Sequence, residues 1–225
     1  MKTTMKLLAK RRGNLLMAVG LLLVIAAALL TAYNFWDESR AEGAAQQVLS
    51  EIEAVTLDGN ASDAEIALDE VPEYVVHPEM DMPSLTLDRS KYIGILEIPV
   101  IGLRLPIMAE WSTSNSKIAP CRYSGTAYLN DMVIAGHNYR SHFGSLNKLQ
   151  VGDEILFIDI DDNRFLYNVV ETEVLAPTEI DRMVSGPWDL TLFTCTYGGR
   201  TRFTVRCRAV YDSGTNIYQQ IEPTA

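Results

Sequence analysis

Hydrophobic and polar positions set off the first 33 residues from the rest of the chain. Residues 2–12 carry five basic side chains and no acidic one, and the 19 residues from Leu15 to Tyr33 carry no charge. As a helix this uncharged run is roughly 28 Å long, which matches one hydrocarbon core. Phe35 and Trp36 follow it, as aromatic residues do at membrane interfaces. The pattern predicts a cytoplasmic basic tail over 1–14 and a transmembrane signal-anchor over 15–33.

Two alternatives to an anchor are a cleaved signal peptide and a buried core helix. A signal peptide has a shorter apolar region, of about 7–15 residues, followed by small residues at a cleavage site. Here aromatic residues occupy the place where cleavage is expected. Basic residues stay on the cytoplasmic side, so we expect a single-pass plasma-membrane protein whose remaining chain is extracellular.

The next segment, residues 34–90, is polar and acidic. It holds 14 acidic residues against Arg40 and Arg89 alone. Val48, Ile52 and Val55 are spaced as on one face of an amphipathic helix, and a Pro-punctuated polar stretch follows. We therefore predict an acidic extracellular stalk or linker. A lid that covers a site, formed by part of residues 72–90, is the alternative.

From Tyr92 onward the residue pattern changes to short β-rich runs separated by Pro, Gly and Asx turns. The runs DMVIAGH, EILFIDI, RFLYNVVETEVL, LTLFTC and TRFTVRCRAVY alternate or are continuously apolar, and EILFIDIDDNRFLYNV indicates a hairpin. A short helix is expected around SNSKIAPCRYS, and APTEIDRMVSGPWD is expected to be a long loop. Strands at this spacing with few helices predict a mostly β domain over 91–225, built as a closed, mostly antiparallel barrel.

Three polar residues stand at the ends of these predicted strands. His137 ends DMVIAGH, Cys195 ends LTLFTC, and Arg202 opens the returning strand only seven residues after the cysteine. A short turn brings Arg202 back beside Cys195. A thiolate is a nucleophile, an imidazole exchanges its proton with a thiol and a leaving amine, and a guanidinium stabilises an oxyanion. The set predicts cysteine-dependent acyl transfer.

Each of these residues also has a purely structural interpretation. Cys195 could fill space in the core, His137 could be a polar residue at the sheet edge, and Arg202 could be a charge on the exposed strand face.

A metal site is not predicted, because the spacing between Cys195 and Cys207 lacks the CxxC pattern of zinc sites. Without the five basic residues of the tail, 14 Lys and Arg oppose 29 Asp and Glu, a net charge of −15, which argues against nucleic acid as a partner.

Together these segments resemble the sortases, the membrane-anchored cysteine transpeptidases of Gram-positive bacteria. TLFTC resembles the family's TLxTC signature, IAGHNYRSHFGSLNKLQVGDEI its histidine segment, TRFTVRCRAV its arginine strand and YIGILEIPVIGLRLPI its opening strands. The resemblance covers roughly 92–211 in the family's order of His, Cys and Arg. It implies a closed sortase-type β-barrel of about eight strands with short helices.

The resemblance also implies roles for the site residues. Cys195 is the nucleophile that cleaves a C-terminal sorting signal of a secreted protein, His137 is the general acid and base, and Arg202 stabilises the oxyanion or holds substrate. Thr194 matches the family's threonine before the cysteine and assists the oxyanion or substrate site. An amine of a cell-wall precursor or a pilin lysine resolves the thioester. No metal and no organic cofactor is implied.

Several choices stay open at this point. Arg206 faces the same way as Arg202 and is its rival, with Arg202 favoured because it is nearer the turn; His142 is the weaker rival of His137. Cys121, expected in the short helix, and Cys207, expected in the core, are either buried free thiols or a disulfide. The short turn after Cys195 resembles those of class B and class C sortases, and both a cell-wall anchoring enzyme and a pilus polymerase fit.

Two functions of other classes fit the same sequence. A secreted cysteine peptidase or hydrolase uses the same residues with water as the acceptor. A catalytically silent surface assembly module keeps the barrel without turnover. A transpeptidase converts an added amine into an amide, a hydrolase releases an acid, and a silent module shows no dependence on Cys195.

Overall fold

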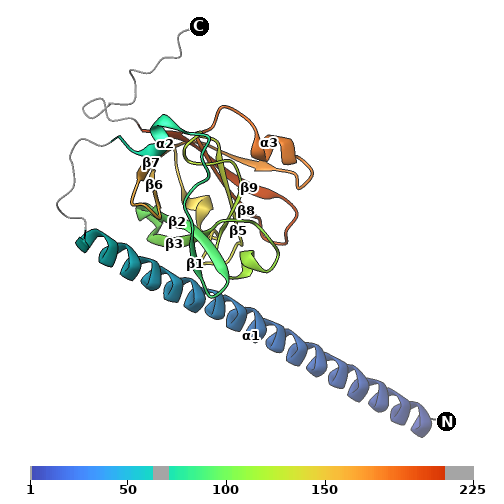
Figure 1. Ribbon diagram of the computed structural model, residues 1–225. Helices are drawn as coiled ribbons and strands as arrows, with labels where there is room; N and C mark the ends of the chain where they lie inside the picture. The colour runs from blue at the N-terminus through green and yellow to red at the C-terminus, as the bar shows by residue number, and fades with distance from the viewer. Residues whose placement is uncertain (1, 63–70, 211–225) are drawn as a thin grey trace. The chain divides into compact units, whose positions relative to one another are not determined.

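The computed structural model of the protein describes residues 2–62 and 71–210. Its first element is helix α1 (Lys2–Ser62), drawn in blue in Figure 1. The chain divides into two compact units, the first ending at Arg40 and the second beginning at Ala41. The second unit contains the β-sheet and is the part of the molecule that positions the candidate site.

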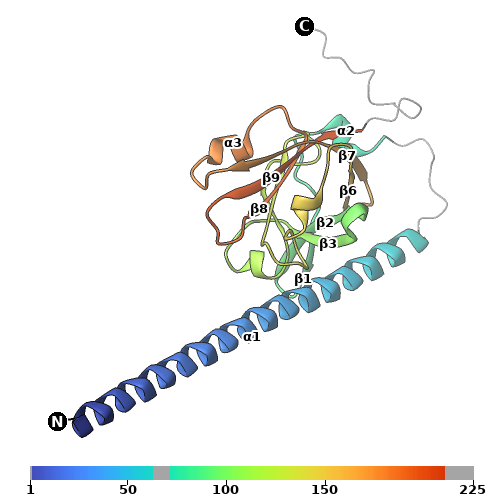
Figure 2. The ribbon, with the colours of Figure 1, turned by 180° about the vertical axis from the view of Figure 1, so that it is seen from behind.

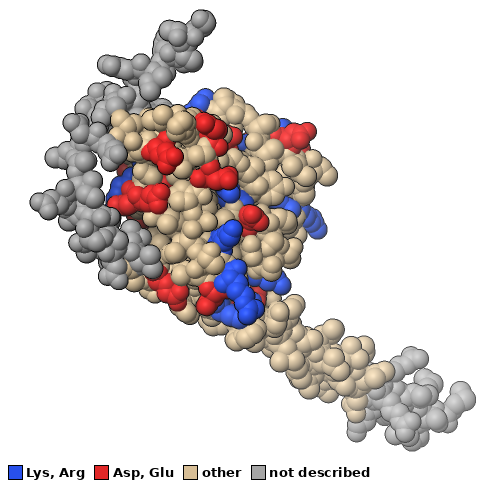
Figure 3. All heavy atoms as spheres, in the orientation of Figure 1, with Lys and Arg blue, Asp and Glu red and all other residues tan. Residues whose placement is uncertain are grey.

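The first unit has the composition of a membrane-spanning helix. A candidate span in α1 begins at Asn14, and none of its most apolar window is buried. Figure 3 shows no Lys, Arg, Asp or Glu on the described helical stretch that follows the grey N-terminal atoms. By length and composition this helix can cross a membrane, as predicted for residues 15–33.

The sheet of the second unit closes on itself as a barrel of eight strands within residues 71–210 (Figures 1 and 2). Neighbouring strands follow the order β2-β3-β4-β5-β8-β9-β7-β6, and β6 pairs back with β2. A ninth strand, β1, pairs only with the start of β2. The strands are β1 (Leu85–Leu87), β2 (Ser90–Ile98), β3 (Leu103–Met108), β4 (Cys121–Ser124), β5 (Met132–Gly136), β6 (Glu154–Asp159), β7 (Arg164–Leu175), β8 (Leu190–Cys195) and β9 (Arg202–Ala209).

Alternation along the strands decides which side chains form the core. On β8, Leu190 and Leu192 are fully buried inside the barrel, so Phe193 and Cys195 lie on its outer face. Most neighbouring strands are antiparallel, whereas β5 and β8 run parallel. The predicted mostly antiparallel barrel is therefore confirmed, and its one long parallel pair brings the ends of β5 and β8 to the same edge.

Apart from α1, the described helices are short. They are α2 (Glu73–Val76), η1 (Pro99–Ile101), η2 (Asn115–Lys117), η3 (Leu146–Lys148) and α3 (Ile180–Val184). Two local predictions need correction. Cys121 does not lie in the expected short helix, because the helical turn η2 ends at Lys117 and Cys121 opens β4. The expected long loop before β8 contains α3, which lies against β8.

Parts of the segment predicted as a stalk pack on this barrel. Leu49 and Ile52 of α1 are buried in a cluster with Tyr92 and Met108. Farther along, Met82 is buried in the main core. Ionic contacts of Arg104 with Glu53 and Glu97 accompany the helix packing. The second half of α1 is thus an amphipathic helix with one face on the barrel, as the spacing of Val48 and Ile52 predicts.

Candidate active site

The pairing of β8 with its two neighbours brings the three predicted site residues to one edge of the barrel. Cys195 ends β8 and is directly opposite Arg202, the first residue of β9. On the other side of β8, Gly136 at the end of β5 pairs in parallel with Thr194, so His137 follows where Cys195 lies. All three side chains are partly exposed. The structure thus brings a thiol, an imidazole and a guanidinium together.

A tight turn over 196–201 makes the approach of Arg202 possible. Gly198 and Gly199 have φ values of 80° and 71°, a left-handed conformation that glycine adopts without strain. The backbone N–H of Thr196 donates to the carbonyl oxygen of Thr201 at 3.0 Å. The Arg202 guanidinium donates to the carbonyl oxygens of Gly199 and Thr201, each at 3.2 Å, which holds it at the edge of the barrel.

The position of His137 depends on residues that sequence reasoning did not single out. Gly136 must lack a side chain, because a Cβ there would lie 2.6 Å from the ring of Phe143. Ser116 of η2 lies with its Oγ 3.3 Å from Nε2 of His137, and the Tyr139 ring stacks on the imidazole at 5.0 Å. Ser116 is 21 positions from His137 in the chain, so no local pattern could have indicated this contact.

The two rival residues lie elsewhere. Arg206 is buried under the segment before β8, where it forms an ion pair with Glu173. His142 is fully buried behind Tyr139. Burial is the main cause, and the nearby His137 the second, that lowers the pKa of His142 to about 4. Neither rival presents its polar atoms at the edge where Cys195 ends its strand.

The other two cysteines are buried free thiols, and no disulfide joins them. Burial raises the pKa of Cys121 to about 12 and raises that of Cys207 as well. A thiol of such high pKa carries almost no thiolate at neutral pH. Cys195 is the partly exposed free cysteine of the three.

The side chain of Thr194 does not lie beside the thiol of Cys195, although the two residues are neighbours in the chain. Because side chains alternate along a strand, Thr194 points to the inner face of the barrel with Leu192. Its Oγ1 is buried and has no hydrogen-bond partner among the residues that the structure describes. The structure therefore brings three of the four predicted site residues together and turns the hydroxyl of the fourth away.

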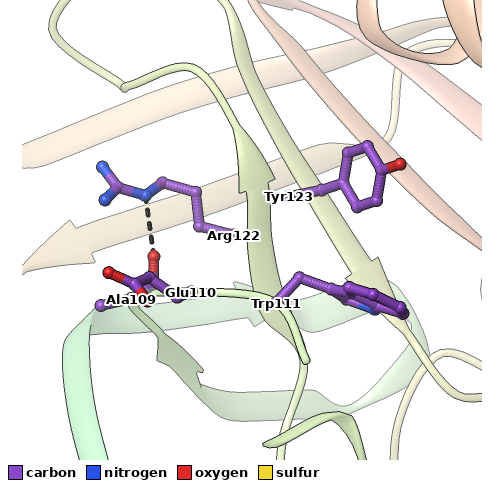
Figure 4. Close-up of a pocket in the computed structure, with 5 residues that line it drawn as sticks. All are labelled: Ala109, Glu110, Trp111, Arg122 and Tyr123. Atoms are coloured by element: carbon purple, nitrogen blue, oxygen red, sulfur yellow. Dashed lines mark hydrogen bonds between the residues drawn. The ribbon is translucent and has the colours of Figure 1, made fainter. Parts of the chain in front are cut away.

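A row of aromatic rings leads from the outer face of β8 to a pocket of about 540 Å³. Phe193, two residues before Cys195, contacts Tyr123 edge-on with ring centroids 5.5 Å apart, and Tyr123 contacts Trp111 at 5.9 Å. Figure 4 shows these last two rings on one side of the pocket and Arg122 on the other, donating to the carbonyl oxygen of Ala109 at 3.0 Å. Sequence reasoning missed this row because its members come from three separate segments.

Within residues 2–62 and 71–210, no group of three or more His, Cys, Asp or Glu side chains is arranged to hold a metal ion.

A closed eight-stranded barrel with short helices, preceded by a long apolar helix and carrying Cys, His and Arg at neighbouring strand ends, defines a sortase-type protein. A family model described as the sortase domain matches residues 96–210, just over half of the chain. The protein belongs to the sortase family, as the resemblance implied.

Individual relatives agree with this assignment. Sortase A of Bacillus anthracis is 23% identical over 189 residues, which covers 79% of this chain and 85% of that protein. Among solved structures, a Clostridium perfringens sortase D5 transpeptidase has 22% identity and a TM-score of 0.51 over 72% of this chain and 99% of that one. Sortase C1 of Streptococcus agalactiae has 21% identity and a TM-score of 0.50, covering 73% of this chain and 90% of that one. These structures share the fold.

Proposed function

We propose that this protein is a cysteine transpeptidase that cleaves the C-terminal sorting signal of secreted proteins and transfers the new carboxyl end to an amine. The observation that carries the proposal is the pairing of Cys195 directly opposite Arg202, with His137 at the end of the adjacent parallel strand. Sortases act on proteins that bear sorting signals, which supports this class of substrate.

In the first step the Cys195 thiolate attacks the scissile carbonyl carbon. A C–S bond forms, and the peptide C–N bond breaks as His137 delivers a proton to the leaving amine. The oxyanion of the tetrahedral intermediate lies next to Arg202, whose guanidinium donates to it without being consumed. The product is a thioester between the substrate and Cys195.

In the second step an acceptor amine attacks the thioester carbonyl and loses a proton to His137. The C–S bond breaks, the Cys195 thiolate is restored, and an amide joins the two chains. The acceptor is an amine of a cell-wall precursor or a lysine of a pilin subunit. The half-exposed position of all three groups lets donor and acceptor reach them from solvent.

We further propose a plasma-membrane location with the N-terminus cytoplasmic and the catalytic domain outside. The apolar span in α1 supplies the anchor, and the five basic residues of the tail orient it. Residues 34–90 connect the anchor to the catalytic domain of 91–225, with the packed portions described above acting as part of the barrel unit.

The test is intact-mass spectrometry of the full chain in detergent, incubated with a panel of sorting-signal peptides, with and without a glycine or lysine amine. We expect an acyl adduct that the amine converts into a new amide, and no adduct on the matched Cys195→Ala protein. Release of acid only, even with excess amine, identifies a hydrolase. A full panel that gives no adduct on the folded wild type points to a silent assembly module and overturns the proposal.

A further inference from the structure

Ser116 is one of the few polar side chains of the barrel unit that are almost completely buried, with 5% of its surface exposed. Its Oγ has two partners, the carbonyl oxygen of Thr113 and Nε2 of His137, each at 3.3 Å. A serine in a helical turn commonly donates to a carbonyl three or four residues earlier, so the contact with Thr113 alone is an ordinary local bond. The contact with His137 connects Ser116 to the candidate active site.

The two contacts of the Ser116 hydroxyl together assign the proton on the imidazole. A hydroxyl has one proton to donate and two lone pairs that accept. The carbonyl oxygen of Thr113 can only accept, so the hydroxyl proton of Ser116 goes to it. A lone pair of Oγ then faces the ring, and Nε2 of His137 carries a hydrogen that it donates to Oγ. The neutral imidazole is thereby held in the tautomer with its hydrogen on Nε2.

The turn η2 that carries Ser116 is itself fixed. The backbone N–H of Ser116 donates to the carbonyl oxygen of Ser112 at 2.9 Å, and the backbone N–H of Asn115 donates to the Ser112 hydroxyl at 3.0 Å. Just after this turn, Ala119 is fully buried in the cluster that contains Ile52 of α1. Ser116 therefore presents its hydroxyl from a defined position.

The ring of His137 is held from other sides as well. The Tyr139 ring stacks on the imidazole with an interplanar angle of 25°. The backbone N–H of Phe143, which is fully buried, donates to the carbonyl oxygen of His137 at 3.0 Å. Stacking fixes the plane of the ring but does not distinguish its two nitrogens, whereas the contact of Ser116 with Nε2 does.

A hydrogen fixed on Nε2 makes Nδ1 the nitrogen that exchanges protons. The lone pair of this tautomer is on Nδ1, so Nδ1 takes the proton when the Cys195 thiol becomes a thiolate. The ring is then an imidazolium whose Nε2–H is still donated to Ser116, and Nδ1 gives its proton to the leaving amine. In the second step the acceptor amine loses its proton to the same nitrogen.

The contact between Ser116 and His137 should strengthen when the ring is charged. A separation of 3.3 Å is long for a hydrogen bond between nitrogen and oxygen, which usually spans about 2.7–3.2 Å. A bond donated by a charged ring is shorter, about 2.7–2.9 Å, and roughly twice as strong. Ser116 therefore stabilises the imidazolium more than the neutral ring, and this difference favours the proton transfers of the reaction.

We propose that Ser116 is a positioning residue that holds the hydrogen of His137 on Nε2 and leaves Nδ1 to exchange protons with Cys195 and the two amines. This inference rests on the proposed transpeptidase function and adds a residue behind the imidazole to it. Ser116 acts through the ring of His137, as the orienting member of a nucleophile–histidine set does.

The first measurement reads the tautomer directly and needs no turnover. The chain contains three histidines, so the full-length protein labelled with ¹⁵N-histidine gives few ring signals in detergent, and His137→Gln identifies those of His137. Long-range ¹H–¹⁵N correlation spectra are recorded on Cys195→Ala, which has no thiol to share the proton, at pH 9, well above the ordinary pKa of an imidazole. We expect the Nε2–H tautomer at His137.

The same spectra test the part of Ser116. Adding Ser116→Ala to the Cys195→Ala protein should give a detectable fraction of the Nδ1–H tautomer at His137, because Nε2–H has then lost its acceptor. Ser114→Ala is the matched control, since Ser114 is an exposed serine beside the same turn whose hydroxyl contacts Ser112. It should leave the spectrum of His137 unchanged.

The second measurement is steady-state transpeptidation by full-length proteins that keep Cys195. Ser116→Ala should lower kcat roughly tenfold, a part of the 10²–10⁴ that general acid–base catalysis contributes, with KM within about twofold of the wild type. Ser116→Thr keeps a hydroxyl and should recover most of the lost kcat. Ser114→Ala should match the wild type in both parameters, and circular dichroism checks that each variant is folded.

The inference is overturned if His137 carries its hydrogen on Nδ1 in the Cys195→Ala protein, or if Ser116→Ala leaves either the tautomer or kcat unchanged. It is also overturned if a folded Ser116→Thr is as slow as Ser116→Ala. If the added methyl group prevents Ser116→Thr from folding, the tautomer comparison decides. A folded wild type with no Cys195-dependent acyl transfer overturns the proposed function, whereas the tautomer measurement still confirms or refutes the contact of Ser116 with Nε2.

Discussion

The exposed edge of the barrel and the buried parts of the same unit contain the same kinds of residue in different states. Cys195, His137 and Arg202 are partly exposed at the ends of β8, β5 and β9. Each has a buried counterpart: Cys207, His142 and Arg206. The buried members are packed, neutral or ion-paired, whereas those at the edge keep room around their polar atoms. Burial, and not residue type, therefore decides which member of each pair is available for chemistry.

The largest expected effect concerns the thiols. Cys195→Ala should abolish acyl-enzyme formation, because the alanine has no nucleophile. Cys207→Ala should keep turnover and lose only about 1 kcal/mol of unfolding free energy. Iodoacetamide at pH 8 should alkylate Cys195 alone, since burial raises the pKa of Cys121 to about 12 and that of Cys207 as well. Peptide mapping of the alkylated protein measures this, and alkylation of Cys207 in the folded protein would break the comparison.

The next effect concerns the buried arginine. Arg206→Met removes the buried partner of Glu173, which keeps only its exposed ion pair with Arg182, and the loss of a buried partner costs up to about 3–5 kcal/mol of unfolding free energy. Chemical denaturation monitored by circular dichroism measures the loss. The double variant Arg206→Met with Glu173→Met should recover part of it, because the carboxylate that has lost its buried partner is then gone and Arg182 keeps its ion pair with Glu179. A loss equal to the sum of both single variants contradicts the assigned pairing.

The arginine at the edge should behave in the opposite way. Arg202→Ala should lower kcat by about 10²–10³, as removal of one oxyanion donor does, with an unfolding free energy close to that of the wild type. Steady-state transpeptidation with a sorting-signal peptide and an amine measures kcat. If Arg202→Ala is active and the folded Arg206→Lys loses kcat instead, the two arginines have been assigned the wrong way round.

The buried histidine predicts a pH dependence of stability. Its pKa in the folded protein is lowered to about 4, below the ordinary value near 6.5, so the unfolded chain takes up the proton first. Its contribution is complete above pH 6.5 and is lost as the pH falls towards 4, by up to about 3 kcal/mol. His142→Phe should flatten the unfolding free energy over this window. Identical slopes for both proteins would show that His142 is accessible to protons in the folded state.

The smallest effect is expected at Thr194, whose hydroxyl lies on the interior side although its neighbour is Cys195. Thr194→Val keeps the shape and removes a buried hydroxyl without a partner among the described residues. The unfolding free energy should rise by about 1 kcal/mol, and kcat should stay within about twofold. A loss of kcat comparable to that of Arg202→Ala would instead support the predicted part of Thr194 in the oxyanion site.

Much of the fold follows from local patterns. The hairpin of β6 and β7, the strands that end in His137 and Cys195, and the apolar span of α1 were all predicted from alternation, turn residues and length. Local sequence patterns gave the wrong secondary structure at two places where tertiary packing decides it. Cys121 opens a strand because α1 and its neighbours cover that face. The helix α3 forms where the guanidinium of Arg206 donates to its last carbonyl oxygens.

By itself the sequence indicated one apolar span long enough to cross a membrane, a β-rich domain, and Cys, His and Arg in sortase order at predicted strand ends. These properties depend on residue type and on short-range spacing. The tertiary structure decided which arginine lies on β9 directly opposite Cys195, which histidine is buried, and that Ser116 contacts His137. These outcomes depend on burial and on pairing between segments distant in the chain, which spacing along the sequence does not encode.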